Sequence, residues 1–306
     1  MNKIIGHKKQ KDFLIKIALS DQIPHAFIFS GVDKIGKTSI AIAFSKLILC
    51  SNSGCNNCRT CVDIDKNVFP DLCFITSQNN NIEIEKIRSI REFLNLKSYN
   101  SKKKIAIIEN AHLMGVDGQN SILKILEEPP KDSIIILVTS FPEMILATIK
   151  SRVQKIDFNG VSRKEIEEYL ILKGADKKEA EEIGMFSSGK IGKAIELLEN
   201  KEEKEFFLET MKTIRFLMGQ GFEKRFEYVK NIYEDKEKVA EILNIFERFM
   251  RRIMFLKLYN KEDNDFKSYS LLRIKDIIEE IQKTKYYFNN TNTNKKLLLE
   301  NLMIKI

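Results

Sequence analysis

The stretch Gly31-Val32-Asp33-Lys34-Ile35-Gly36-Lys37-Thr38 decides the fold of the first half of this chain. It fits the phosphate-binding loop pattern G-x-x-x-x-G-K-[ST] at every fixed position. The apolar run Ala26–Phe29 before it is typical of a strand, and the amphipathic run Ser39–Leu49 after it is typical of a helix. The sequence therefore predicts a phosphate-binding loop. The alternative is a glycine turn that happens to precede a lysine.

Four residues of this loop are candidate nucleotide ligands. Gly31 and Gly36 would let backbone N–H groups surround phosphate oxygens, and the amino terminus of the following helix would add a positive dipole end. Lys37 would neutralise the β- and γ-phosphates, and the hydroxyl of Thr38 would hold Mg²⁺. The sequence therefore predicts a site for ATP or ADP with Mg²⁺.

Composition sets broad limits on the protein. The chain has 306 residues, of which 43% are hydrophobic, enough for two or three domains with a buried core. The net charge of +8 favours a polyanion or an acidic protein as partner, although the 43 acidic residues make a solvated surface an equally good explanation. Neither a signal peptide nor an apolar run long enough for a membrane span is visible, which predicts a soluble cytoplasmic protein.

The first half of the chain alternates two kinds of pattern. Segments rich in Ile, Val and Phe are typical of strands and occupy 26–30, 71–76, 104–109, 133–139 and 153–158. Helical patterns lie between them at 39–49, 83–97, 117–127 and 142–150. This alternation predicts an α/β fold with a parallel sheet covered on both faces, and places the phosphate loop at the carboxyl ends of the strands.

After residue 158 only helical patterns follow. Three short helices are expected at 162–173, 177–186 and 191–200, and the first is expected to begin with a capping box of Ser162 and Glu165. Long helices are expected at 201–218, 222–233, 236–259, 268–288 and 294–304. These changes of pattern predict three domains, 1–159, 160–200 and 201–306.

A cysteine cluster interrupts the first domain. Cys50, Cys55, Cys58 and Cys61 have the spacing C-x4-C-x2-C-x2-C, and four thiolates so close together can close a tetrahedral Zn²⁺ site. Because such a site leaves no open coordination position, we expect the zinc to be structural. The alternatives are an iron–sulfur cluster or accidental clustering. Cys73 lies in an apolar strand and is expected to be a small core residue.

Three later motifs, taken with the phosphate loop and the cysteines, point to a known family. They are Ile107–His112, the segment Gln119–Pro130 with its L-K-x-L-E-E-P-P string, and Ser151–Val153. Together with the phosphate loop and the cysteine module at 50–61, they closely resemble the bacterial DNA polymerase III clamp-loader subunits, which are AAA+ proteins of the replication machinery. The resemblance covers nearly the whole chain. It implies an AAA+ domain, a small helical lid and an all-α collar that holds a ring of subunits together.

Within that family the chain most resembles the delta-prime type of subunit, because two residues of the motor subunits are missing. Asn110 stands where the family's catalytic glutamate polarises the attacking water, and an amide accepts a proton poorly. Glu109, just before it, would still support Mg²⁺ through water. Gly192 stands where the motors carry an arginine that touches the γ-phosphate. We therefore expect nucleotide binding with weak or absent hydrolysis, unless the alignment is shifted by one residue.

The resemblance assigns roles to further residues. Thr139 and Ser140 match the family's first sensor position, where either hydroxyl would meet the γ-phosphate or its water; a strand-end hydroxyl without such a role is the alternative. Arg152 matches the arginine of the Ser-Arg-Cys motif, with Val153 in place of cysteine. In the family this arginine enters the ATP site of the neighbouring subunit, and a surface salt bridge is the alternative. Ile5 and Gly6 resemble a turn beside the adenine.

Partners also follow from the resemblance. It implies a hetero-oligomeric ring with gamma/tau motor subunits and a delta subunit, and contact with the sliding clamp and primed DNA through that complex. The chain would be a subunit of the DNA polymerase III holoenzyme, itself no polymerase and at most a weak ATPase. The rival interpretations are an ATP-hydrolysing gamma/tau-like motor subunit, favoured by the intact Lys37-Thr38, and a stand-alone zinc-dependent DNA-binding protein.

Overall fold

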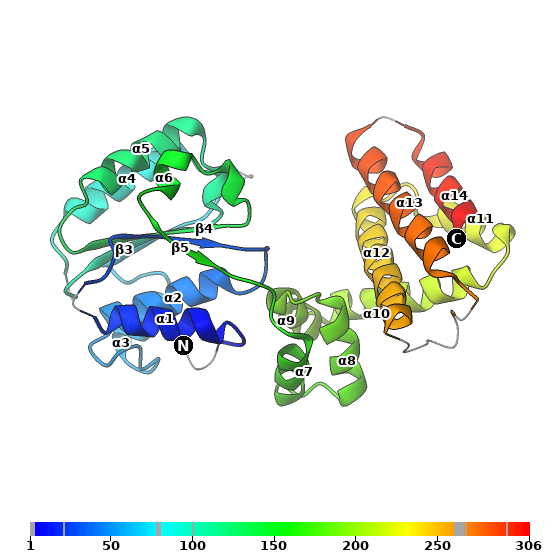
Figure 1. Cartoon of the computed structure of the whole chain (residues 1–306), viewed down its shortest axis with the longest axis horizontal. Helices are drawn as coiled ribbons and strands as arrows, with labels where there is room; N and C mark the ends of the chain where they lie inside the picture. Colours follow the sequence, from blue (N-terminus) through cyan, green and yellow to red (C-terminus); the bar gives the residue numbers. More distant parts are fainter. Residues whose placement is uncertain are drawn as a thin grey trace. The chain divides into compact units, whose positions relative to one another are not determined.

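The chain forms two compact units, 1–195 and 196–306, in the computed structural model shown in Figure 1. The residues described are 4–20, 22–77, 81–99, 101–259, 266, 268–291 and 293–306. The predicted division into three domains stays a prediction.

A five-stranded parallel sheet forms the centre of the first unit, which confirms the predicted α/β class. Its strands are β1 (Ala26–Ser30), β2 (Leu72–Ile75), β3 (Lys104–Ile108), β4 (Ser133–Thr139) and β5 (Gln154–Asp157). Their order in the sheet is β2-β3-β4-β1-β5. Every residue of β1, β3 and β4 is buried, which explains why these strands appear in the sequence as unbroken apolar runs.

Helices cover both faces of this sheet (Figure 1). On one face lie α1 (Lys8–Ala18), α2 (Lys37–Leu49) and α3 (Arg59–Asp65), and on the other lie α4 (Ile84–Asn95), α5 (Val116–Glu127) and α6 (Ala147–Lys150). Side chains alternate between the faces along each strand. Phe27 and Phe29 of β1 therefore pack with the α1–α3 layer, whereas Ile28 packs with the α4–α6 layer.

The helix predicted at 142–150 is wrong. The segment divides into a 3-10 turn, η2 (Pro142–Met144), and the single turn of α6, with Ile145 and Leu146 extended between them. The break is held because the side chain of Gln119 on α5 accepts a hydrogen bond from the backbone N–H of Leu146. Two helices, α1 and α3, are absent from the sequence prediction. The second is only seven residues long and begins inside the cysteine motif.

Three short helices follow the sheet: α7 (Arg163–Leu172), α8 (Lys177–Phe186) and α9 (Ile191–Glu199). The capping box is confirmed, because Ser162 accepts from the backbone of Glu165 and the Glu165 carboxylate accepts from the backbone of Ser162. All three helices form close to their predicted positions, because their apolar residues repeat at the helical period.

The second unit is helical. It contains α10 (Lys201–Met218), α11 (Phe222–Ile232), α12 (Lys236–Leu258), α13 (Leu271–Asn290) and α14 (Lys295–Lys305). A polar network joins two of them, since the partly buried carboxylate of Glu247 on α12 accepts from Lys285 and Gln282 on α13. Among the residues that the structure describes, no helix is long and apolar enough to cross a membrane.

Candidate functional site

The phosphate loop joins β1 to α2 at the carboxyl end of β1, as predicted. Gly31 begins the loop with φ +150°, and a Cβ at that position would lie 2.3 Å from the backbone oxygen of Phe158. No residue with a side chain fits there unless the backbone moves. The glycine at the first fixed position of the motif is therefore explained by the close approach of the chain that leaves β5.

Lys37 lies at the centre of this loop. Its ammonium donates to the carbonyl oxygens of Gly31 at 2.8 Å and Val32 at 2.7 Å, and to the hydroxyl of Ser140 at 3.1 Å. Burial lowers the pKa of Lys37 to about 8, although the carboxylates of Asp33 and Glu109 oppose this shift. The loop therefore holds a partly desolvated positive charge, which favours binding of a phosphate.

Thr38 at the start of α2 and Glu109 directly after β3 lie close together at the carboxyl-terminal edge of the sheet. The Thr38 hydroxyl donates to the Glu109 carboxylate over 2.6 Å. In phosphate-loop proteins these two positions hold Mg²⁺ directly or through water. Asn110 follows in a left-handed conformation with φ 53° and begins the short 3-10 turn η1 (Ala111–Leu113). The strand end therefore supplies one carboxylate beside the loop, and the next position has an uncharged amide.

The two candidate sensor hydroxyls have different surroundings. Thr139 is fully buried; its hydroxyl pairs with Nδ1 of His112 at 3.2 Å and accepts from the backbone N–H of Phe141. Burial, reinforced by the charge of Lys37, lowers the pKa of His112. Ser140 is the residue whose hydroxyl contacts Lys37. The geometry therefore favours Ser140 over Thr139 as the hydroxyl nearest a bound phosphate.

Two contacts that the sequence did not predict hold the phosphate loop from outside. The imidazole Nε2 of His7 hydrogen-bonds to the carbonyl oxygen of Ile35 at 2.7 Å. The backbone N–H of Gly192 on α9 donates to the carbonyl oxygen of Lys34 at 2.8 Å, and a Cβ on Gly192 would lie 3.0 Å from that oxygen. A side chain at position 192 would therefore press on the loop. The only sequence signal for His7 was its place beside the Ile5-Gly6 turn.

The low pKa of Lys37 predicts that nucleotide affinity depends on pH. Below pH 8, Lys37 of the free protein is already protonated and can neutralise a phosphate. Above pH 8, Lys37 has lost its proton and must take one up when the nucleotide binds. We expect the affinity for a fluorescent ADP analogue to fall from pH 8 upward, by at most about tenfold per pH unit. Constant affinity between pH 7 and pH 9.5 would contradict this. A Lys37→Met variant should bind weakly at every pH.

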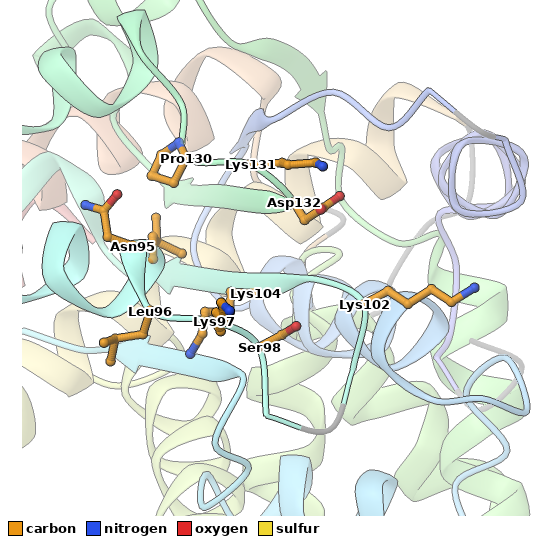
Figure 2. A pocket seen from close by; sticks show the side chains of 10 residues that line it. Asn95, Leu96, Lys97, Ser98, Lys102, Lys104, Pro130, Lys131 and Asp132 are labelled. Atoms are coloured by element: carbon orange, nitrogen blue, oxygen red, sulfur yellow. The ribbon is translucent and has the colours of Figure 1, made fainter.

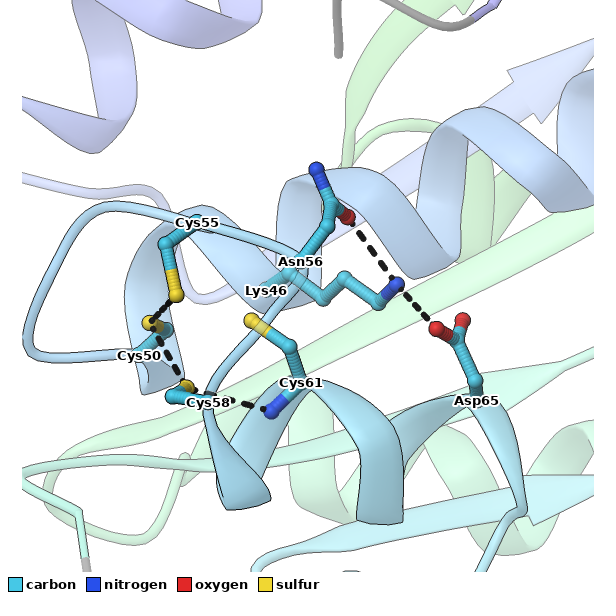
Figure 3. A network of polar contacts seen from close by, with 7 residues as sticks. All are labelled: Lys46, Cys50, Cys55, Asn56, Cys58, Cys61 and Asp65. Carbon is cyan, nitrogen blue, oxygen red and sulfur yellow. Dashed lines mark hydrogen bonds and ion pairs between the residues drawn. The ribbon is translucent and has the colours of Figure 1, made fainter.

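The four clustered cysteines form a candidate metal site (Figure 3). Their sulfur atoms all lie within 4.8 Å of one another, and Sγ of Cys50 is 3.5 Å from that of Cys58 and 3.9 Å from that of Cys55. Zn–S bonds of about 2.3 Å in a tetrahedron require sulfur–sulfur distances of about 3.8 Å. The residues therefore fit a Cys₄ metal site. Cys73 lies apart from this cluster, on β2.

The backbone around the cysteines is arranged to support thiolates. Cys50 caps the carboxyl end of α2, and Cys58 caps the amino end of α3, where its sulfur accepts from the N–H of Cys61. Burial opposes ionisation of Cys50, but N–H groups of Cys55, Asn52 and Gly54 outweigh it and lower its pKa to about 6. Burial raises the pKa of Cys61 to about 12. Metal binding would therefore displace a proton from Cys61.

Arg152 is not part of this nucleotide site. It lies just before β5, at the amino-terminal edge of the sheet, whereas the phosphate loop lies at the carboxyl-terminal edge. Its guanidinium is 3.1 Å from the carboxylate of Glu127 and donates to the backbone oxygen of Thr148. The side chain is 38% exposed. Arg152 therefore faces the surface of its own subunit, where a neighbouring molecule can meet it.

Gln119 is a further residue that sequence reasoning did not single out. Its buried amide donates to the backbone oxygens of Met114 and Met144 and accepts from the N–H of Leu146. It thereby fixes the segment that leads through α6 to Arg152. The sequence signal that could have identified it is a polar glutamine on the otherwise apolar face of α5.

A cavity of about 420 Å³ lies at the amino-terminal edge of the sheet (Figure 2). Lys97, Lys102, Lys104 and Lys131 line it together with Asp132. The ammonium of Lys104 is buried, 3.6 Å from a carboxylate oxygen of Asp71 and above the ring of Phe93. Lys104 is thus part of the core, and the cavity is separate from the phosphate loop.

Comparisons with known proteins place the chain in a family. It is 32% identical over 188 residues to the DNA polymerase III subunit delta' of Bacillus subtilis, covering 60% of this chain and 57% of that protein. It is 29% identical over 294 residues to the subunit gamma of Buchnera aphidicola from Schizaphis graminum, covering 85% and 78%. The chain thus spans little more than half the length of the Bacillus relative.

Among solved structures, a DNA polymerase III gamma subunit-related protein from Thermotoga maritima is 20% identical, with a TM-score of 0.43 over 96% of this chain and 97% of that one. The family model described as "DNA polymerase III, delta subunit" matches residues 6–162. That match covers half of the chain and contains the phosphate loop, the cysteine cluster and Arg152. The chain therefore belongs to the DNA polymerase III delta-subunit family, a clamp-loader family.

Proposed function

We propose that this chain is a delta-prime-type subunit of the DNA polymerase III clamp loader, which helps to load the sliding clamp onto primed DNA. The observation that carries the proposal is a complete phosphate loop beside an incomplete catalytic edge. Lys37 and Thr38 contact Ser140 and Glu109, but the position after Glu109 is Asn110. Such a site can hold a nucleotide and lacks the base that would orient a water molecule.

The nucleotide would be ATP or ADP with Mg²⁺. Lys37 would contact its phosphates, Thr38 and Glu109 would hold the cation, and Ser140 would lie beside the terminal phosphate. The glycine at position 192 supports the absence of turnover, because it has no side chain that could contact a phosphate. The nucleotide would therefore support structure in this subunit.

Arg152 would act in a neighbouring subunit. Its place at the opposite edge of the sheet from the phosphate loop, on an exposed surface, supports a role outside its own site. A guanidinium is permanently charged and planar, and it suits the γ-phosphate of a second ATP molecule. The subunit would thereby complete the ATP site of a gamma/tau motor.

The remaining parts would serve assembly. Zn²⁺ held by Cys50, Cys55, Cys58 and Cys61 would be structural, since four thiolates leave no open position. The helices of the second unit would hold the chain in a ring with gamma/tau and delta subunits. Through that ring it would reach the clamp and primed DNA in the cytoplasm. Family membership argues against the stand-alone DNA-binding protein.

Nucleotide binding without turnover separates this proposal from the rival motor subunit, which the complete Lys37-Thr38 pair favours. We expect the isolated chain to bind the fluorescent ADP analogue and to release phosphate from ATP no faster than its Lys37→Ala variant. We also expect it to assemble with the gamma/tau and delta subunits of its own organism on gel filtration. Turnover by the isolated chain that disappears in Lys37→Ala would establish the motor instead.

A further inference from the structure

Lys46 is a buried cation beside the cysteine cluster. It lies on α2, one turn before Cys50, and only 8% of its side chain is exposed. Its ammonium is 2.6 Å from a carboxylate oxygen of Asp65 and 3.2 Å from the amide oxygen of Asn56 (Figure 3). A buried charge is unfavourable unless it is paired and hydrogen-bonded, and both partners come from the segment that carries the other cysteines.

The network joins the three backbone segments that supply the sulfur atoms. Lys46 belongs to the helix that ends at Cys50. Asn56 directly follows Cys55 in the loop, and Asp65 lies one turn after Cys61 on α3. One ammonium therefore links all three segments, although it provides no ligand itself, since an ammonium has no lone pair.

Asn56 connects Lys46 to the backbone of the cysteine loop. Its side-chain oxygen accepts from Lys46 at 3.2 Å, and the residue directly follows Cys55. Its backbone is left-handed, with φ 64°. A residue in this strained conformation needs contacts that hold it there, and the bond from Lys46 is one of them.

We propose that Lys46 is a positioning residue of the metal site: its ammonium holds the cysteine loop in the metal-binding arrangement and so slows release of the metal. This inference rests on the proposal that the four cysteines bind zinc. Four thiolates around one Zn²⁺ leave a net negative charge, which a nearby ammonium offsets. Groups that support metal ligands in this way typically change metal affinity by about 10–100-fold when they are replaced.

A purely structural ion pair is the ordinary alternative, and the surroundings allow it to be tested. Lys46, Asn56 and Asp65 all line a cavity of about 360 Å³, and 56% of the Asp65 side chain is exposed. Water can therefore solvate the partners that remain when Lys46 is replaced. Loss of the ammonium should leave the fold intact, so that an effect on metal release can be measured by itself.

The experiment measures zinc transfer from the full chain to a chromogenic chelator, 4-(2-pyridylazo)resorcinol. Lys46→Met keeps the length and removes the charge, and we expect about tenfold faster release and about tenfold weaker affinity. Asn56→Gly and Asp65→Asn each remove one partner and keep Lys46. We expect both to accelerate release, and to add little when combined with Lys46→Met, because the three side chains act as one network.

Arg59→Met is the matched control. Arg59 is adjacent to Cys58 and carries the same charge as Lys46. Its side chain, however, is 95% exposed, and it pairs at 3.6 Å with Asp63 of its own helix. We expect release at the wild-type rate from this variant. Equal acceleration by Arg59→Met would overturn the proposal, because the effect would then be general electrostatics. So would a wild-type rate in Lys46→Met.

Folding of each variant is followed by circular dichroism of the zinc-loaded chain. If Lys46→Met folds poorly, Asn56→Gly and Asp65→Asn decide the question, and wild-type release from both would refute the network. A folded wild-type chain with intact thiols and no stoichiometric zinc would refute the metal site itself, and Lys46 would then be a structural ion pair. Failure of the inference and failure of the metal proposal are therefore distinct results.

Discussion

Arg152→Ala in a reconstituted clamp loader is expected to remove ATP turnover at the neighbouring ATP site in which we propose that Arg152 acts. An arginine supplied in trans to a phosphoryl transfer contributes about 10³–10⁵-fold in rate. Arg152 is exposed, lies away from its own phosphate loop and pairs only with the surface residues Glu127, Thr148 and Ser151 among its described contacts. Its replacement should therefore leave the fold and the nucleotide affinity of this chain unchanged.

Turnover is measured with clamp and primed DNA present, and assembly is checked by gel filtration. Arg152→Lys should not restore the rate, because an ammonium cannot make the two-pronged contact of a guanidinium. Lys150→Ala is the matched control, since Lys150 is an exposed cation two residues earlier and donates to a backbone oxygen. Undiminished turnover by an assembled loader that contains Arg152→Ala would refute the arginine role and leave the subunit as a scaffold.

Cys58→Ser is expected to cause the largest loss of stability. Cys58 caps α3 and lies 3.5 Å from Cys50 in the cluster, so that its loss opens the tetrahedron. Structural zinc sites stabilise small domains by about 10–16 kcal/mol in isolation. If the metal contributes only about 3 kcal/mol to the stability of this unit, its loss should lower the melting temperature by roughly 6–12 °C.

Metal content and melting temperature are measured on the same preparations, purified without chelator. Cys73→Ser is the control, because Cys73 is half-buried on β2 and outside the cluster. It should keep one zinc per chain. Identical melting of Cys58→Ser and the wild-type chain, with zinc absent from both, would exclude a structural metal.

Local sequence patterns were sufficient to predict much of the secondary structure. The five strands and the capping box at Ser162 formed where the sequence predicted them, because alternation of apolar segments and turn residues acts over a few positions. Prediction failed where a distant residue intervened. Gln119 breaks the segment 142–150 through contacts 25 and 27 residues away, which no local pattern contains.

The sequence by itself determined the chemistry that the chain carries: a phosphate loop with Lys37, four cysteines at metal-binding spacing, and an arginine in a family motif. Each of these motifs lies within a short segment, so the spacing of its residues along the chain already holds them close together in space. Only the tertiary structure decided that Ser140 contacts Lys37, that Arg152 pairs with Glu127, and that Lys46 donates to Asn56 in the cysteine loop. Each of these depends on how separate elements pack, and packing brings together residues whose separation along the chain carries no signal.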